Sequence, residues 1–205
     1  LCGVPVMVMQ GRMHEYEGYT PEEVVYPIRV ARLLGVESLL VTNAAGAINE
    51  SFSVGDLMLI RDHIRLMGSS PLKGPNLPDF GPRFCDMTTA YDPDFLVMAE
   101  KEGKKLGLPM REGNYFFFPG PQFETPAEIC AARILGGDAA GMSTVYEVTA
   151  AAHCGMRTLG ISLMTNMAAG ILKQKLSGEE VNRTAEAARE HFSALVRACL
   201  PHMAG

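Results

Sequence analysis

The sequence predicts an α/β fold built around a largely parallel or mixed β-sheet. Short apolar runs rich in β-branched residues alternate along the chain with segments of helical periodicity, a pattern typical of a sheet covered by helices. No internal repeat or low-complexity segment interrupts the alternation. The 205 residues, 47% of them apolar, favour one domain over residues 1–205 with a substantial buried core.

Five apolar runs predict β-strands. The first, from Val4 to Gln10, has the composition of a buried strand. The other predicted strands cover residues 38–42, 57–61, 114–118 and 157–165. Ligands of such sheets bind beyond the carboxyl ends of strands, so the residues that follow these runs are candidates for a site.

Helix starts lie between the predicted strands. Residues 20–23 place Thr at the N-cap, Pro in the first turn and Glu three residues after the cap, and Gly35 is a helix stop. Thr125 and Thr144 begin similar patterns, each with a Glu three residues after the predicted N-cap, and Ser177 caps a long terminal helix. Predicted helices therefore cover about residues 21–34, 93–107, 126–135, 145–153 and 178 onwards. The Gly- and Pro-rich residues 67–87 lack periodicity and are typical of a functional or mobile loop.

Composition argues against several classes of function. A net charge of −5 disfavours nucleic acid as a partner, because the phosphate backbone selects basic surfaces. The five cysteines form no C-x-x-C pair and the five histidines no H-x-x-x-H pattern, so we expect scattered buried thiols and no metal site. No apolar run has membrane-spanning length and no signal peptide is visible, which indicates a cytoplasmic protein without membrane contact.

The first candidate site residues follow the first predicted strand. Arg12, His14 and Tyr16 are spaced by two, so an extended segment would point all three to one side. A guanidinium, an imidazole and a phenol on one side suit an oxyanion beside a polar organic ligand. A solvated strand end with surface charges is the alternative.

In the stretch from Val41 to Ala47 the second predicted strand enters a run of tiny residues, Ala44 to Ala47. Backbone N–H groups in such a run can approach and hold an anion, and a tight turn is the alternative. The G-x-G-x-x-G pattern is absent, so this is not a dinucleotide-binding fingerprint.

Further polar groups occupy other strand ends. Glu124 can accept hydrogen bonds from a ligand while Phe123 covers the ligand's apolar face, or Glu124 only adds favourable charge at a helix N-terminus. Residues 141–144 stand between a strand end and a helix start, and Thr165-Asn166 end an apolar strand, where a lone Asn is usually a turn residue. Together these groups predict a small-molecule pocket, although none forms an evident nucleophile–base pair.

The motifs resemble those of the homotrimeric purine nucleoside phosphorylases, in that family's order and over nearly the whole chain. The matching strings are Gln10-Gly11-Arg12-x-His14-x-Tyr16-Glu17-Gly18, Thr42 to Gly46, Val54 to Met58, Gly120-Pro121-x-Phe123-Glu124-Thr125, Gly141 to Val145 and Thr165-Asn166-x-Ala168-Ala169-Gly170.

The resemblance implies a three-layer phosphorylase fold with a central mixed sheet flanked by helices. It also implies cleavage of 6-oxopurine nucleosides, such as inosine and guanosine, to the free base and (deoxy)ribose 1-phosphate. Inorganic phosphate would be a co-substrate and no cofactor would be needed. The assembly would be a homotrimer with active sites near the subunit interfaces.

The resemblance also implies a role for each candidate residue, with His14, Glu124 and Asn166 as the catalytic candidates and Glu17 orienting His14. Phosphate would be bound by Arg12, His14, Ser143 and the amide of Ala44. The ribose would contact Tyr16, Met142 and, from the neighbouring subunit, Phe84. The base would be held by Glu124 and Asn166, with Phe123 packed beside it.

Three features depart from the family pattern. The resemblance implies an N-terminal segment with a Gly/Ser phosphate loop that these 205 residues do not include, and since the sequence opens at Leu1 in a strand-like run we expect either a fragment or a chain without that segment. Tyr146 replaces the usual Pro, and Gly178 stands where a His would approach the sugar 5′-hydroxyl. The missing segment keeps open a catalytically impaired or non-catalytic relative. A methylthioadenosine phosphorylase is a second alternative, but it accepts 6-amino purines and lacks the Glu124–Asn166 pair.

Overall fold

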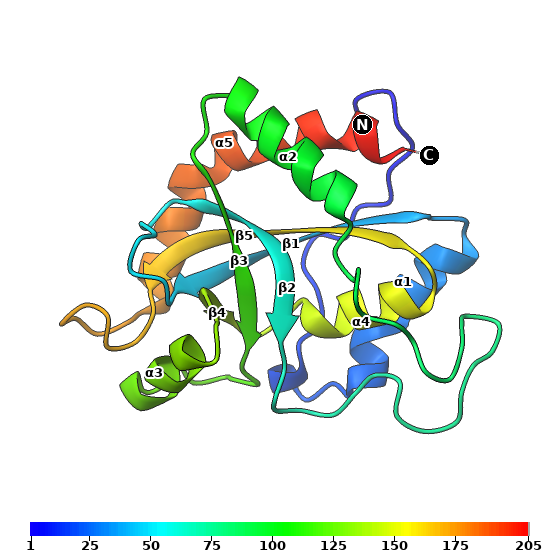
Figure 1. Cartoon of the computed structure of the whole chain (residues 1–205), viewed down its shortest axis with the longest axis horizontal. Helices are drawn as coiled ribbons and strands as arrows, with labels where there is room; N and C mark the ends of the chain where they lie inside the picture. Colours follow the sequence, from blue (N-terminus) through cyan, green and yellow to red (C-terminus); the bar gives the residue numbers. More distant parts are fainter. Residues whose placement is uncertain (205) are drawn as a thin grey trace.

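Five strands close into a barrel in the computed structural model, which describes residues 1–204 (Figure 1). The order around the barrel is β1, β4, β3, β2 and β5. The strands are β1 (Ser38–Ala47), β2 (Leu57–Ile64), β3 (Met110–Phe117), β4 (Ala139–Gly141) and β5 (Arg157–Met167). The helices are η1 (Glu15–Glu17, a 3₁₀ turn), α1 (Pro21–Leu33), α2 (Pro93–Lys105), α3 (Pro126–Ile134), α4 (Val145–His153) and α5 (Gly178–Met203).

The sheet is mixed, as predicted. β1 runs parallel to β5, and β3 runs parallel to both β2 and β4. The pairs β1–β4 and β2–β5 are antiparallel and close the barrel. The α/β class with a mixed sheet and flanking helices is therefore confirmed.

Helices cover different sides of the barrel. In Figure 1, α2 and α5 lie together over one side, and α1 and α4 pack together on another. α3 packs Ile129 and Ala132 against Phe116 of β3 and Ala140 of β4. Because the helices surround the strands, the barrel is buried on its outer face as well as inside.

The alternation along β2 divides the core. Leu57 and Leu59 pack in the cluster that includes α2 and α5, whereas Met58 and Ile60 belong to the cluster that includes α1 and α4. Side chains of a strand alternate between its two faces, so a strand buried on both faces has a continuous apolar sequence. This explains why the run at residues 57–60 showed no apolar–polar alternation.

Four of the predicted helix starts have the expected caps. The side-chain oxygens of Thr20, Asp92, Thr125 and Ser177 each accept a first-turn backbone N–H at 3.0–3.2 Å. The cap predicted at Thr144 is wrong: α4 begins there, but the Thr144 side chain makes no cap hydrogen bond.

The strand predicted at residues 4–10 is also wrong. Within the part of the chain that the structure describes, this segment pairs with no strand, and the side chains from Val6 to Met9 are 38–73% exposed. A β-strand needs the backbone N–H and C=O groups of a neighbour, which an apolar composition alone does not supply.

β1 is longer than predicted. It continues through the tiny residues to Ala47 because residues 43–47 pair with β5, with a register shift between Ala45 and Gly46. The tight turn considered for this run is therefore absent from it, and Asn43 and Ala44 lie within the strand rather than beyond its end.

A long connection between Ile64 and Pro93 has no helix or strand, which agrees with the loop predicted at residues 67–87. Arg29 of α1 donates to the Pro71 carbonyl and lies 5.5 Å from the ring centroid of Phe80. Phe84, in the same connection, is 90% exposed.

Candidate active site

Thr144, directly ahead of α4, gathers polar groups from three parts of the chain. Its Oγ1 accepts hydrogen bonds from Arg12 Nη1 at 3.2 Å and Asn43 Nδ2 at 2.8 Å, and lies 3.1 Å from Ser143 Oγ. A hydroxyl has two acceptor positions and one proton, so Thr144 donates its proton to Ser143. The Ser143 hydroxyl then keeps its own proton for another acceptor, such as an oxyanion.

The backbone at Thr144 is strained. Its φ of 75° and ψ of −47° form a γ-turn in which the Val145 N–H donates to the Ser143 carbonyl at 2.8 Å. A positive φ is costly for a residue with a Cβ, and such strain persists where the surroundings impose it, often at functional sites. The hydroxyl serves Arg12 and Asn43 rather than α4, which is the physical reason why the predicted cap fails.

Tyr115 of β3 fixes the backbone of Ser143. The Ser143 N–H lies 3.2 Å from Tyr115 Oη, to which it donates. Gly141 makes room for this contact, since a Cβ at Gly141 would lie 2.2 Å from the same oxygen. Burial raises the pKa of Tyr115 to about 12, so its phenol stays neutral at physiological pH.

Arg12 is held against the first turn of α4. Its Nη1 lies 3.0 Å from Oε1 of the buried Glu147, and its Nη2 donates to the Thr42 carbonyl. These contacts and the one to Thr144 engage three of the five guanidinium N–H groups. Two N–H groups therefore remain for an anion at the partly open edge of the guanidinium.

His14 and Tyr16 come together through a turn. The extended geometry considered for residues 12–16 is interrupted by η1, yet the two rings stack with centroids 4.6 Å apart. Glu17 accepts from the His14 backbone N–H at 2.8 Å, and its Oε2 lies 3.4 Å from His14 Nδ1. Burial and the Glu17 charge raise the pKa of Tyr16, which keeps the phenol protonated.

Tyr16 and Met142 converge on Gly120. A Cβ built on Gly120 would lie 2.5 Å from Met142 Sδ and 3.2 Å from Tyr16 Cδ1, and the φ of Gly120 is +69°. Glycine is therefore needed for both space and backbone conformation. The segment after β3 thus touches two of the residues that sequence reasoning placed at one sugar.

Asn166 lies near the end of β5 and is 4% exposed. Its Oδ1 accepts from Thr165 Oγ1 and its Nδ2 donates to the Met167 carbonyl, both at 3.0 Å. Gly46 of β1 permits this packing, because a Cβ there would approach Asn166 Nδ2 to 3.1 Å. One N–H of the amide is left for a ligand.

Glu124 and Phe123 lie in the connection between β3 and α3. Burial raises the pKa of Glu124, while the side chain of Phe123 is 40% exposed. Gly170, beyond β5, packs against Pro126, to which a Cβ would approach within 2.6 Å. The segment after Asn166 therefore lies against the N-terminus of α3, directly after Glu124.

Comparison with known proteins places this arrangement in a family. Residues 2–201 match the model of the Phosphorylase superfamily. The chain is 55% identical to purine nucleoside phosphorylase 1 of Bacillus subtilis over 198 residues, which cover 97% of this chain and 73% of the relative. It belongs to the purine nucleoside phosphorylase family.

More distant members of the family share the fold. Purine nucleoside phosphorylase of Rattus norvegicus is 48% identical over 96% of this chain and 70% of its own length. The solved structure of the Schistosoma mansoni purine nucleoside phosphorylase with inosine has a TM-score of 0.95 at 40% identity, covering 98% of this chain and 73% of that one. The same enzyme with adenosine also gives a TM-score of 0.95.

Two candidate residues of this purine nucleoside phosphorylase family member lie apart from the contacts above. Phe84 lies exposed on the long connection between β2 and α2. Within residues 1–204 it has no hydrogen bond or aromatic contact with the other candidates. Ala44 is exposed on β1 beside Asn43, opposite Leu163 of β5. Gly178 is the first residue of α5, and a Cβ there would meet open space.

Sequence reasoning missed several residues that organise the site. Asn43, Tyr115 and Glu147 received no role, and Thr144 was interpreted as a helix cap. Only Glu147 gave a usable signal, since a carboxylate in a buried apolar helix requires a partner.

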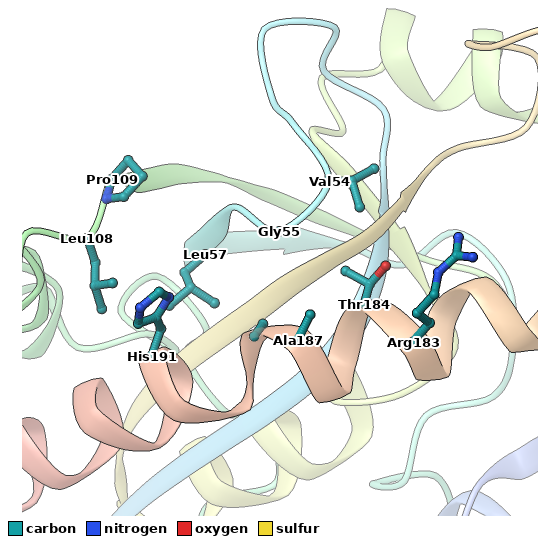
Figure 2. A pocket seen from close by; sticks show the side chains of 10 residues that line it. Val54, Gly55, Leu57, Leu108, Pro109, Arg183, Thr184, Ala187 and His191 are labelled. Atoms are coloured by element: carbon teal, nitrogen blue, oxygen red, sulfur yellow. The ribbon is translucent and has the colours of Figure 1, made fainter.

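A hollow of about 600 Å³ lies elsewhere, between α5 and the residues that precede β2 and β3 (Figure 2). It is lined by Val54, Gly55, Leu57, Leu108, Pro109, Arg183, Thr184, Ala187, Ala188 and His191. None of the candidate site residues lines it. Among residues 1–204 no three His, Cys, Asp or Glu side chains are grouped to hold a metal, and no helix is long and apolar enough to cross a membrane.

Proposed function

We propose that this chain catalyses the phosphorolysis of 6-oxopurine nucleosides, such as inosine and guanosine, to free base and (deoxy)ribose 1-phosphate. The observation that carries the proposal is the pair of anion donors Arg12 and Ser143, which Thr144 holds together beside the segment that carries the stacked His14 and Tyr16. The names of the relatives support the same reaction.

Phosphate is the anion that this cluster fits. The free N–H groups of Arg12 and the Ser143 hydroxyl are fixed donors, and His14 and the Ala44 amide complete the proposed set. Because Thr144 and Glu147 already hold Arg12, its donors need little reorganisation when phosphate binds. Inorganic phosphate is then a co-substrate, and the reaction requires no cofactor.

The proposed chemistry needs positioning rather than a covalent intermediate. Cleavage of the glycosidic bond builds positive charge on the sugar and negative charge on the departing base. Bound phosphate stabilises the sugar cation and attacks it, while Tyr16 and Met142 hold the ribose. Glu17, 3.4 Å from His14 Nδ1, orients the imidazole toward phosphate.

Base recognition is assigned to Asn166 and Glu124. The free amide N–H of Asn166 donates to N7 as negative charge gathers on the purine, and Glu124 accepts from N1–H, with Phe123 beside the ring. Adenine carries a bare acceptor at N1, which leaves two facing acceptors unpaired at about 1–3 kcal/mol each. The proposal therefore favours inosine and guanosine over adenosine.

The proposed assembly is a homotrimer in the cytoplasm. The 90% exposure of Phe84 supports a role for this ring in a neighbouring subunit's site. A closed ring of three would give each site one such ring.

Turnover of purified protein tests the proposal. Phosphate-dependent release of hypoxanthine from inosine is expected, with a kcat/KM at least tenfold above that for adenosine. Turnover must be measured rather than binding, because a Schistosoma mansoni relative has been solved with adenosine bound. No release from any purine nucleoside would favour a non-catalytic relative, and equal use of 5′-methylthioadenosine would favour the other alternative.

A further inference from the structure

We propose that Tyr146 is a positioning residue that fixes the turn carrying His14 and Tyr16. The inference rests on the proposed function, which assigns those two residues to phosphate and ribose. Tyr146 lies in the first turn of α4 with 3% of its surface exposed, and its hydroxyl donates to Oε2 of Glu15 at 2.7 Å. Glu15 is the residue between His14 and Tyr16.

Neighbouring residues of α4 hold two points of the same segment. Glu147 pairs with Arg12 at 3.0 Å, and Tyr146 holds Glu15 three residues further along. Between and beyond these points the segment relies on η1, a 3₁₀ turn of three residues. Such a short turn has few hydrogen bonds of its own, so the contacts with α4 determine where it lies.

The Tyr146 ring is itself held in one orientation. Its centroid lies 5.1 Å from that of Phe117, and the Arg65 guanidinium lies 5.9 Å from it. On the hydroxyl side, a Cβ at Gly68 would approach Tyr146 Oη to 2.2 Å, so only glycine leaves room for the phenol. The ring therefore presents its hydroxyl to Glu15 as a rigid donor, and bonds to a carboxylate are stronger than those between neutral groups.

The Tyr146–Glu15 hydrogen bond joins two positions outside the motif strings to which the resemblance assigns roles. Proline, which the family motif leads one to expect at position 146, has no hydroxyl to offer. The motif also leaves position 15 open. Tyr146 and Glu15 thus add a connection between α4 and the phosphate- and ribose-facing turn that the motif residues do not provide.

Removal of one hydroxyl tests the role. Tyr146→Phe keeps the ring packing and loses the bond to Glu15, so the KM values for phosphate and inosine should rise about three- to tenfold, with a smaller change in kcat. Tyr91→Phe is the matched control: Tyr91 is equally buried and bonds His63 Nδ1 at 3.0 Å. Its KM values should stay within twofold of wild type.

Changes at Glu15 separate positioning from general stability. Glu15→Ala should raise both KM values as far as Tyr146→Phe, and the double variant should be no worse than either single variant. Glu15→Gln keeps an acceptor oxygen and should restore most of the affinity. Wild-type KM values in Tyr146→Phe, or additive effects in the double variant, would overturn the proposal.

Direct titration with phosphate keeps this outcome distinct from the proposed function. If wild-type protein binds phosphate without turnover, the reaction is refuted but the Kd for phosphate still decides the role of Tyr146, with the same three- to tenfold weakening expected. A wild-type chain that neither binds phosphate nor turns over inosine overturns both proposals.

Discussion

Arg12 and Glu147 are 135 positions apart in the sequence, yet their side chains meet at 3.0 Å between the segment ahead of η1 and the first turn of α4. Glu147 is 6% exposed, and a buried carboxylate needs a partner such as this guanidinium. Arg12 therefore has a structural role, because it stabilises the buried carboxylate of Glu147. This role is separate from its proposed role in binding phosphate.

The two roles of Arg12 can be separated. Arg12→Ala leaves Glu147 buried without its partner and should reduce the free energy of unfolding by about 3–5 kcal/mol. Adding Glu147→Gln removes the stranded charge and should restore most of that stability, while phosphate binding stays lost. Urea unfolding and phosphate titration of wild type, the single variant and the double variant measure the two effects. Recovery of phosphate binding in the double variant would contradict the assignment of Arg12.

The strain at Thr144 predicts an unusual order among substitutions. Thr144→Ala removes the acceptor shared by Arg12 and Asn43 but keeps a Cβ at a φ of 75°. Thr144→Gly removes the same acceptor and also relieves a cost of about 1–3 kcal/mol for the strained γ-turn backbone. The Gly variant should therefore be more stable than the Ala variant by about that amount in urea unfolding, whereas Thr144→Ser should retain phosphate affinity.

A reversed order, with the Ala variant the more stable, would show that Thr144 does not occupy the positive φ in solution. Equal phosphate affinity in the Ala and Ser variants would show that the shared hydroxyl does not organise the phosphate donors.

Local signals explain which parts of the fold could be predicted from the sequence. Thr20, Asp92, Thr125 and Ser177 each act within one turn of their own helix, and their helices begin where the pattern places them. Thr144 has the same local pattern, but its partners Arg12 and Asn43 are 132 and 101 positions away. Propensity cannot detect such partners, because they are set by how the barrel closes.

The same limit applies to the strands and to the site. The apolar run at residues 4–10 has strand composition but no pairing partner, whereas the tiny residues after Thr42 have turn composition but pair with β5. The family resemblance assigned roles to Ser143, Met142 and Tyr16. Gly120, which adjoins Met142 and Tyr16, and Gly141, which makes room for Tyr115, acquire their meaning only from distances to side chains remote in sequence.

Phe84 should act in a neighbouring subunit. A chain carrying Arg12→Ala and Glu147→Gln lacks its own phosphate site but keeps Phe84, and a Phe84→Ala chain has the reverse defect. In randomly mixed trimers, about a quarter of the sites should combine an intact phosphate site with an intact Phe84. Inosine phosphorolysis after co-refolding should exceed the sum of the two parents. Activity equal to that sum would place Phe84 in its own subunit's site or outside any site.

Glu124 should make both the reaction and the stability depend on pH, in opposite directions. Burial is the main cause that raises its pKa, and the Glu128 charge raises it further. The folded pKa therefore lies above the unfolded one, so ionised Glu124 lowers stability above its folded pKa, and this loss fades as the pH falls toward the unfolded value of about 4.3. Glu124→Gln should unfold at a higher temperature than wild type at pH 7, with the difference vanishing near pH 4.

The same proton should control base recognition. Once protonated, Glu124 loses the charge with which it accepts from N1–H, so kcat/KM for inosine should fall on the acid side at a pH above that expected for an ordinary glutamate. Glu128→Gln keeps the helix cap and removes one cause of the raised pKa, so it should move this acid limb to lower pH. A stability difference between wild type and Glu124→Gln that is constant from pH 4 to pH 8 would show that packing, and not the buried charge, distinguishes the two side chains.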